Sequence, residues 1–326
     1  MGNTSLVGLL IYFARGTAKE MHYNLHRSGC VQKSRNTSAY VLIKHPSPKM
    51  PFFANGPVSI FYTTHGTDSG PSIVLVHGWA CDAHDWSHQI PLLASLGFRV
   101  IALDLRGHGR SSAPSSISDY SMRAFAGDII ALLEHLQTGP SIIMGHSMGT
   151  VIASILAVEH PTFVKALILA HPIYCGAPPV LVEMTKEMCG NPGSAPRIVA
   201  EFFENYMYTD QTPDWIRTWH IRRVLGTDGI ALAGCGQAIV ELFDKVVGRS
   251  EEAKAFMKER KCPKLVFPTT VLPHAEAWEE ELGLGPLDDL HKMQQGTFSH
   301  FIESERFNEA VKDWLEKRGL IEKKSS

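Results

Sequence analysis

The stretch Met144–Thr150, with the sequence MGHSMGT, decides the fold of this chain. It places Ser147 two residues after Gly145 and two residues before Gly149. Glycine on both sides of a serine indicates a crowded backbone, because glycine is the residue that fits where a side chain cannot. The segments before and after this stretch show which kind of turn needs such spacing.

Ser147 follows a predicted strand and precedes a predicted helix. The apolar run after Gly139-Pro140 is short and ends at Met144, as in a buried strand. Apolar residues then recur at helical spacing over residues 150–160, and Pro161 ends the helix. A serine on such a turn is a nucleophile elbow, G-x-S-x-G, which exposes the hydroxyl at a helix N-terminus. We therefore predict a nucleophilic serine, the alternative being a glycine-rich turn with an incidental serine.

The composition limits the classes of function that are open to the chain. It has 326 residues, of which 44% are hydrophobic and 20% charged, which is enough for a large core. The 31 basic and 33 acidic side chains give a formal net charge of -2, so the charge indicates no nucleic-acid partner. The 6 cysteines form no CxxC pair. They fit free thiols in a reducing compartment, and three disulfides remain open.

The N-terminal residues give no clear targeting signal. The apolar run at residues 6–14 is too short to span a bilayer, and no basic residue precedes it as in a signal peptide. The pair Met1-Gly2 resembles a myristoylation start, but Leu6 stands where serine or threonine is expected. We expect a soluble cytoplasmic protein without a membrane partner, and the sequence leaves its oligomeric state open.

Strands and helices alternate along the first half of the chain. A strand of alternating polarity is predicted at residues 58–64, and apolar strands are predicted at 72–76, 99–103 and 165–170, besides the strand that leads to Ser147. Near-continuous apolar strands separated by helices are typical of a mostly parallel sheet covered on both faces. The predicted organisation is an N-terminal extension (1–54), a first core segment (55–171), a helical cap without a convincing strand (172–262) and a second core segment (263–326).

Residues 57–320 resemble the alpha/beta-hydrolase superfamily, in its cap-bearing branch of small serine esterases and lactonases. The resemblance rests on four blocks in the right order: Val76–Trp79, Asp104–Ser111, Gly145–Gly149 and Phe298–Phe301, the last followed by a C-terminal helix. It implies an alpha/beta-hydrolase fold, with a mostly parallel sheet, helices on both faces and an inserted helical cap. It also implies an enzyme that acts on a small molecule, and it implies no metal or organic cofactor.

The resemblance gives a role to each matched residue. Ser147 would be the nucleophile, and His300, in the loop after the last strand, would be its general base. The backbone N–H groups of Trp79 and Met148 would form the oxyanion hole, which stabilises the charge that develops on the carbonyl oxygen.

Other side chains are expected to bind the substrate or to hold structure. His146, beside the nucleophile, and Trp219, in the cap, are expected to line the substrate pocket, although the cap aromatics fit core packing equally well. His77 is expected to be a structural hydrogen-bonding residue, and Asp104 and Arg106 are expected to hold their loop.

A third residue should orient the base, and both usual positions for this acid lack one. Val271 and Leu272 stand after the strand that follows the cap, and His171 stands after the strand that follows the elbow helix. The acid could be relocated to Glu276, our first choice, or to Glu279 or Glu183. Alternatively, the site could be a serine–histidine dyad.

Chemistry other than hydrolysis is a further alternative. Cofactor-independent dioxygenases, hydroxynitrile lyases and hormone receptors that bind small molecules share the fold that the chain resembles. We place hydrolysis first because Ser147, His300 and the oxyanion framework are all present. The expected substrate is a carboxylic ester, lactone or thioester of a small, mostly apolar molecule.

Overall fold

The structure is a computed structural model that describes residues 30–33, 40–43, 51–174, 177–272 and 274–321. The chain divides into two units, residues 1–50 and 51–326. In the first unit, β1 (Cys30–Lys33) pairs antiparallel with β2 (Tyr40–Ile43). The apolar run at residues 6–14 lies outside the described residues. The second unit begins at Pro51, four residues before the predicted start of the core at 55, so it includes one more strand than expected.

The second unit is built on one sheet with the strand order β10-β9-β8-β7-β5-β6-β4-β3. Its strands are β3 (Phe52–Asn55), β4 (Val58–Gly66), β5 (Ser72–Val76), β6 (Arg99–Leu103), β7 (Ser141–His146), β8 (Val164–Ala170), β9 (Lys264–Phe267) and β10 (Asp289–Leu290). Strands β3 and β4 run antiparallel to their neighbours, and the remaining pairs are parallel. The predicted mostly parallel sheet is confirmed.

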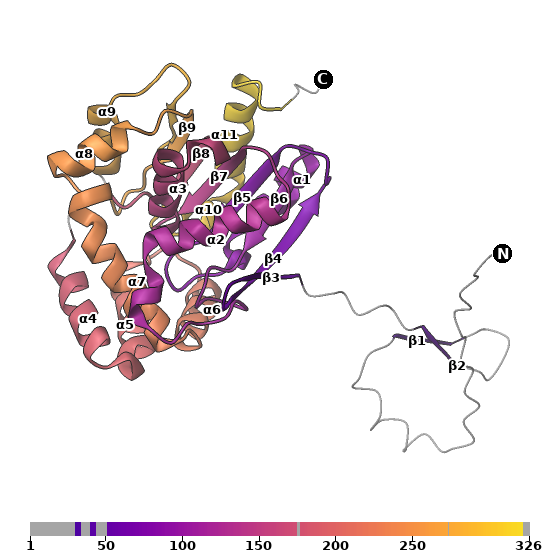
Figure 1. Cartoon of the computed structure of the whole chain (residues 1–326), viewed down its shortest axis with the longest axis horizontal. Coiled ribbons are helices and arrows are strands. Elements are labelled where there is room, and N and C mark those ends of the chain that lie inside the picture. Colours follow the sequence, from indigo (N-terminus) through magenta and orange to yellow (C-terminus); the bar gives the residue numbers. More distant parts are fainter. Residues whose placement is uncertain (1–29, 34–39, 44–50, 175–176, 273, 322–326) are drawn as a thin grey trace. The chain divides into compact units, whose positions relative to one another are not determined.

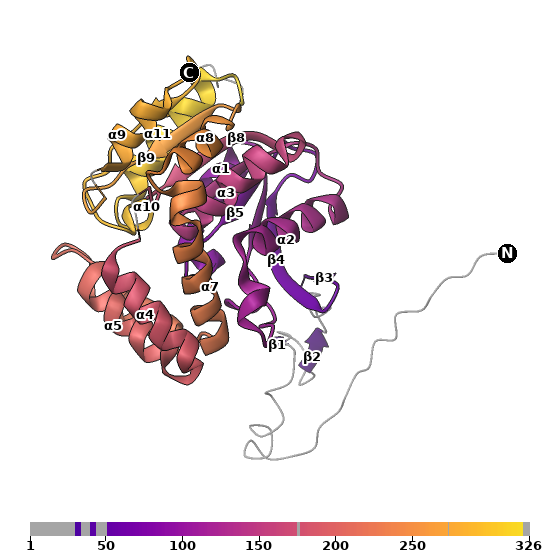
Figure 2. The ribbon, with the colours of Figure 1, turned by 60° about the vertical axis from the view of Figure 1, so that its left-hand side comes forward.

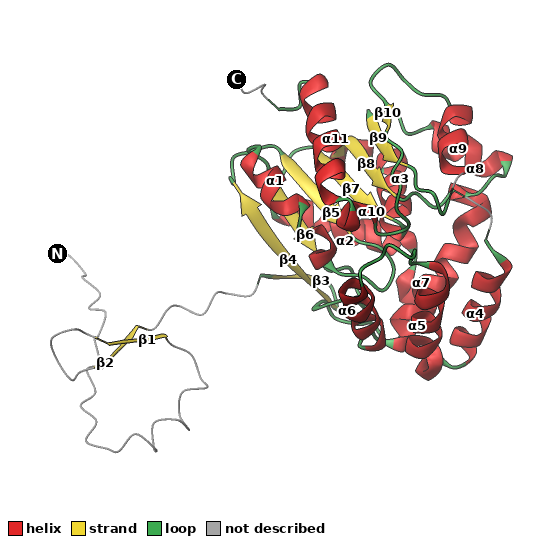
Figure 3. Cartoon of the chain, turned by 180° about the vertical axis from the view of Figure 1, so that it is seen from behind, coloured by secondary structure: helices red, strands yellow, loops and turns green. Residues whose placement is uncertain are grey.

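Helices cover both faces of this sheet (Figures 1 and 3). Helices α1 (Gln89–Ser95) and α11 (Ser304–Lys317) pack on one face, in the same core cluster as Ile73 and Leu75 of β5. Helices α2 (Met122–His135) and α3 (Met148–Glu159) pack on the other face, with Val74 and Val76. Successive strand residues point to opposite faces, so a strand buried on both sides is apolar throughout, as predicted.

In the described part of the chain between β8 and β9 there are five α-helices: α4 (Pro179–Gly190), α5 (Ala195–Tyr206), α6 (Asp214–Leu225), α7 (Gly229–Leu242) and α8 (Glu251–Lys258). The described residues of the range 172–262 include no strand. Figure 2 shows α4, α5 and α7 gathered beyond one end of the sheet. None of the helices in the described part of the chain is long and apolar enough to cross a membrane.

Some elements differ from the sequence prediction. The sequence predicts one helix over residues 85–96, which the structure divides into a 3-10 turn, Ala83–Trp86, and α1. Pro91 explains this division, because its ring would clash with the carbonyl group of Ser87 in a continuous helix. Helix α4 was not predicted, and α9 (His274–Leu282) forms where the sequence left a helix at residues 275–282 open. The last strand has two residues, and the short helix α10 (Ser299–Ile302) follows it before α11.

Candidate active site

Ser147 has the strained backbone of a nucleophile elbow. It lies between β7 and α3 with φ 49° and ψ −115°, and a positive φ is unusual for a residue with a side chain. A Cβ atom on Gly145 would overlap the carbonyl oxygen of Gly149, and one on Gly149 would overlap that of Val76. The crowding that the glycine spacing predicted is therefore present on both sides of Ser147.

Trp79 and Met148, whose backbone N–H groups are expected to form the oxyanion hole, both lie near Ser147. Met148 is the first residue of α3, so its N–H has no acceptor within the helix. Trp79 follows β5 and lines the same cavity as Ser147. The chain passes close to the serine here, because a Cβ on Gly78 would lie 3.3 Å from the Cβ of Ser147. This arrangement fits the predicted oxyanion hole, which stays a prediction.

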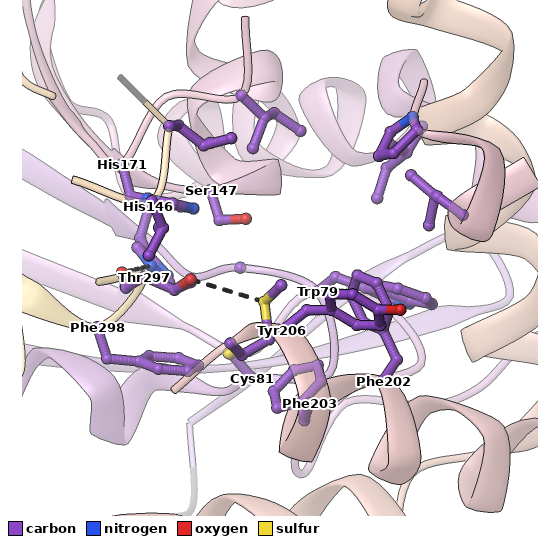
Figure 4. A pocket seen from close by; sticks show the side chains of 18 of the residues that line it. Trp79, Cys81, His146, Ser147, His171, Phe202, Phe203, Tyr206, Thr297 and Phe298 are labelled. Carbon is purple, nitrogen blue, oxygen red and sulfur yellow. Dashed lines mark hydrogen bonds between the residues drawn. The ribbon is translucent and has the colours of Figure 1, made fainter. Parts of the chain in front are cut away.

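Ser147 opens into a cavity of about 310 Å³ between the core and the cap. Figure 4 shows its hydroxyl projecting into this space, with His146 and His171 near it and Trp79, Phe202 and Tyr206 across the space. The full lining is Gly78, Trp79, Cys81, His146, Ser147, His171, Ile173, Pro178, Val180, Leu181, Phe202, Phe203, Tyr206, Met207, Ile239, Phe243, Val271, Leu272, Thr297 and Phe298. No aspartate, glutamate, lysine or arginine is among these described residues, so the cavity suits an uncharged, mostly apolar molecule.

The prediction that Trp219 lines the substrate pocket is wrong. Its ring packs against the rings of His220 and Phe301, with centroids 5.4 Å and 5.6 Å away, and the Arg223 guanidinium lies 5.1 Å from its centroid. Helix α6 turns this face towards the loop after β5 and towards α10, not towards the cavity. Sequence spacing in the cap could not show which face of α6 meets the substrate. His146, in contrast, lines the cavity as expected.

The prediction that His300 pairs with Ser147 is also wrong. The His300 ring is fully buried, with its centroid 4.8 Å from that of Trp86 and 4.3 Å from that of His146. Neither ring nitrogen has a hydrogen-bond partner among the described residues. Burial, reinforced by His146, holds the pKa of His300 well below its usual range.

The residue of this loop that reaches the cavity is Thr297. Its carbonyl oxygen accepts a hydrogen bond from Nε2 of His146 at 2.8 Å. Because α10 starts at Ser299, Thr297 belongs to the loop that ends at the cavity, whereas His300 lies inside the helical turn. The position at the cavity that the sequence suggested for His300 is therefore occupied by Thr297, three residues earlier in the chain.

None of the three proposed carboxylates orients His300. They form ion pairs elsewhere: Glu276 with Lys292 at 3.0 Å, Glu279 with Arg260 at 2.9 Å, and Glu183 with Lys186 at 2.8 Å. Glu276 is the residue that we expected to complete the triad, and this expectation is corrected, because α9 holds it against Lys292 at the surface. Glu279 instead neutralises a buried arginine.

His171 reaches the site from β8, the strand beside β7. The backbone N–H of Ser147 donates to the carbonyl oxygen of Ala170 at 3.0 Å. Ser147 and His171 therefore stand at the adjacent ends of two paired strands. His171 also has a positive φ, 51°, and its Nδ1 lies 2.7 Å from Oγ1 of Thr269. Burial, reinforced by His146, lowers the pKa of His171 to about 3, so the ring is neutral at pH 7. In the sequence, His171 stands where the acid of the triad is expected, but nothing there indicated a function for the histidine itself.

A buried carboxylate, Asp85, lies in the turn after β5. Arg223 of α6 donates to it at 2.6 Å. Burial works to raise the pKa of Asp85, but the charge of Arg223 and the hydrogen bond from it hold this pKa well below its usual range. Cys81, Asp85 and His146 offer ligand atoms within 4.8 Å of one another, which is the donor set of a zinc site. The guanidinium already neutralises this carboxylate, which disfavours a second cation there.

The predicted structural residues have the expected partners. Nδ1 of His77 donates to the carbonyl oxygen of the next residue at 2.8 Å, and its Nε2 accepts from the N–H of Leu105 at 2.9 Å. Asp104 and Arg106 hold their loop through a bond from the N–H of Ala83 at 2.9 Å and an ion pair with Asp128 at 2.6 Å. These residues fix the loops that carry the site.

Comparisons with known proteins agree with this architecture. Residues 71–216 match the family described as alpha/beta hydrolase fold. Bifunctional epoxide hydrolase 2 of Sus scrofa is 36% identical over 128 residues, which are 39% of this chain and 21% of that protein. The chain therefore spans about a fifth of the length of this relative.

Solved structures match over most of the chain. A hydrolase from Pseudomonas aeruginosa PA01 has a TM-score of 0.70 and 22% identity, covering 83% of this chain and 99% of that chain. The enol-lactonase from Burkholderia xenovorans LB400 has a TM-score of 0.70 and 22% identity, covering 81% and 99%. By the match of residues 71–216 and by its architecture, the chain has the alpha/beta-hydrolase fold.

Proposed function

We propose that this protein is a hydrolase in which Ser147 attacks a carboxylic ester, lactone or thioester of a small, mostly apolar molecule. The observation that carries this proposal is the backbone of Ser147, with φ 49° at the first turn of α3 and the side chain in the cavity. Such strain costs about 1–3 kcal/mol and is found where function needs it. An incidental serine in a turn has no need of it.

The arrangement supports acyl transfer in two stages. Oγ of Ser147 attacks the carbonyl carbon, and the N–H groups of Trp79 and Met148 stabilise the oxyanion. The alcohol or thiol then leaves, and water hydrolyses the acyl-enzyme. Loss of one oxyanion-hole donor lowers turnover by roughly a hundredfold to a thousandfold in a well-studied hydrolase, so such donors supply a large share of the acceleration.

The nucleophile favours esters over epoxides, although relatives include epoxide hydrolases. A serine oxygen that opens an epoxide becomes part of an ether, and an ether has no carbonyl carbon for water to attack. The protein would stay alkylated after one turnover. A serine ester formed from an ester or lactone is hydrolysed by water, so Ser147 is restored.

A second candidate is a small-molecule binding protein with little turnover. The observation that favours it is that neither His300 nor any carboxylate lines the cavity in the part of the chain that the structure describes. The cavity would still bind an apolar molecule without this machinery.

Turnover of p-nitrophenyl esters separates the two candidates. We expect hydrolysis of p-nitrophenyl butyrate above the rate with free imidazole, reduced at least a thousandfold in Ser147→Ala. Ser115→Ala, which changes an exposed loop serine, is the matched control and should keep the parent rate. A parent protein that binds the ester without turnover would overturn the hydrolase proposal and support the binding protein.

A further inference from the structure

We propose that His171, not His300, is the general base for Ser147, and that Thr269 positions the His171 ring. This inference rests on the proposed function. His171 lines the cavity that holds Ser147, whereas His300 is not among its described lining residues.

Ser147, His171 and Thr269 follow three neighbouring parallel strands, β7, β8 and β9. The N–H of Ser147 donates to Ala170 at 3.0 Å, and the N–H of His171 donates to the carbonyl oxygen of Phe267 at 3.1 Å. Neighbouring strands lie about 4.8 Å apart, so residues at adjacent strand ends are within side-chain reach of each other. The sheet therefore brings the three residues into one row at its carboxyl edge.

The bond to Thr269 leaves one nitrogen of His171 for chemistry. Nδ1 lies 2.7 Å from Oγ1 of Thr269, whose side chain is fully buried. When Nδ1–H donates to this hydroxyl, Nε2 carries the lone pair that a base needs. The ring lines the cavity that holds Ser147, and Figure 4 shows both residues beside it.

The other histidine of the cavity is less suited to this role. Nε2 of His146 already donates to the carbonyl oxygen of Thr297 at 2.8 Å. Its Nδ1 is buried without a partner against Gly78, where an added Cβ would lie 2.9 Å from it. A substrate cannot enter between them. Among the described lining residues, His171 is the histidine whose second nitrogen is neither bonded nor enclosed.

The proton balance of the reaction is simple. As Oγ of Ser147 bonds to the carbonyl carbon, its proton moves to Nε2 of His171 and the carbonyl π pair moves to the oxygen. Collapse of the intermediate breaks the bond to the leaving oxygen or sulfur, which takes the proton from Nε2. Water then attacks the acyl-enzyme and gives its proton to Nε2. The second collapse releases the acid and returns the proton to Oγ.

A hydroxyl partner makes this base weaker than one held by a carboxylate. Replacing the carboxylate of a well-studied triad by an amide lowers turnover about ten-thousandfold, because the histidine is held in the wrong tautomer. Thr269 can accept from Nδ1 and so keep the useful tautomer, but it offers no negative charge to the imidazolium. The expected enzyme is therefore slow.

His171→Asn and His171→Gly test the base without disturbing the backbone, because both residues tolerate a positive φ. We expect kcat for p-nitrophenyl butyrate to fall about a hundredfold or more in each. Glycine leaves space for a free ring, so added imidazole should restore turnover at least tenfold in His171→Gly and leave Ser147→Ala unchanged. Thermal unfolding of each variant shows whether the loss comes from misfolding.

Thr269 is tested as a positioning residue by paired substitutions. Thr269→Val removes the hydroxyl and should lower kcat about tenfold with KM unchanged, whereas Thr269→Ser keeps the hydroxyl and should retain kcat. Thr270→Val is the matched control, because Thr270 is exposed and its hydroxyl bonds to the carbonyl oxygen of Gln294.

The outcomes separate the base from the proposed function. If Ser147→Ala loses turnover while His171→Asn keeps kcat within threefold, His171 is not the base and the hydrolase proposal stands. A folded His171→Gly that is inactive and does not respond to imidazole also overturns the role of His171. If the parent hydrolyses no ester, the proposed function fails and the base assignment fails with it.

Discussion

The guanidinium of Arg223 on the cap helix α6 lies 2.6 Å from the carboxylate of Asp85 in the turn after β5. The two side chains are 8% and 1% exposed. This ion pair connects the cap to the core close to the cavity, because Cys81, which lines it, lies within 4.8 Å of Asp85. Its formation couples the position of the cap to the loop that carries Trp79.

Breaking this pair should destabilise the protein strongly. Arg223→Met leaves a buried carboxylate without its counter-charge, and such a change costs about 3–5 kcal/mol. The double variant with Asp85→Asn should recover part of this loss. Arg197→Met, in the exposed pair with Glu201, should change the free energy of unfolding by less than about 1 kcal/mol. Urea unfolding measures all three, and equal effects of the two arginine variants would contradict the structure.

The protein should lose stability as the pH falls below about 6.5. Burial lowers the pKa of several histidines: to about 3 for His108 and His171, and to about 4 for His146 and His220. It also lowers the pKa of His77 and His300. Between these values and the usual pKa, the unfolded chain binds more protons than the folded one. Stability is therefore present above the unfolded pKa and lost as the pH decreases towards about 4.

The size of this effect is measurable by urea unfolding at pH 7 and pH 5. Each histidine that stays neutral in the folded state contributes about 2 kcal/mol of destabilisation over this interval. Removing one of them in His171→Asn should make the dependence on pH shallower. A free energy of unfolding that is equal at pH 5 and pH 7 would show that these side chains are not buried as neutral groups.

Gly149→Ala should disrupt the elbow, because the added Cβ would overlap the carbonyl oxygen of Val76. We expect a loss of at least about 2 kcal/mol of stability together with loss of ester turnover. Gly127→Ala is the matched control: Gly127 lies in α2 with no atom within 4 Å of an added Cβ. It should stabilise the protein by about 0.5–1 kcal/mol. A melting temperature that rises in both variants would contradict the crowding at Gly149.

The cavity should select acyl groups by their polarity. Each buried methylene contributes about 0.8 kcal/mol, so kcat/KM should rise from p-nitrophenyl acetate to p-nitrophenyl hexanoate. The p-nitrophenyl half-ester of adipic acid has a similar length but carries a carboxylate. It should be at least a hundredfold poorer, because no lysine or arginine lines the described cavity to neutralise it. A half-ester that is hydrolysed as fast as the hexanoate would show that substrates bind elsewhere.

The elbow could be predicted from the sequence because its determinants are local. The strand before Ser147, the two glycines and the helix after it all lie within about twenty residues, and each has its own pattern. The base could not be predicted in the same way. Whether Thr297 or His300 faces the cavity depends on where α10 begins, and no periodic pattern fixes the start of a helix of four residues.

The remaining features depend on contacts between distant parts of the chain. Asp85 and Arg223 are 138 residues apart, and nothing in either segment indicates the other. The sequence placed His171 after β8, but its value as a base follows only from the pairing of β8 with β7 and from Thr269, which is 98 residues away. Trp219 shows the same limit, since the face that a cap helix presents is set by tertiary packing.

Covalent labelling tests the central claim, that Ser147 is an exposed and activated nucleophile. A fluorophosphonate that reacts with activated serines should add one label per chain, and mass analysis of peptides should place it on Ser147. Ser147→Ala should abolish the label, and Ser115→Ala should retain it in full. A label that persists in Ser147→Ala, or that lies on another residue of the parent protein, would contradict the account.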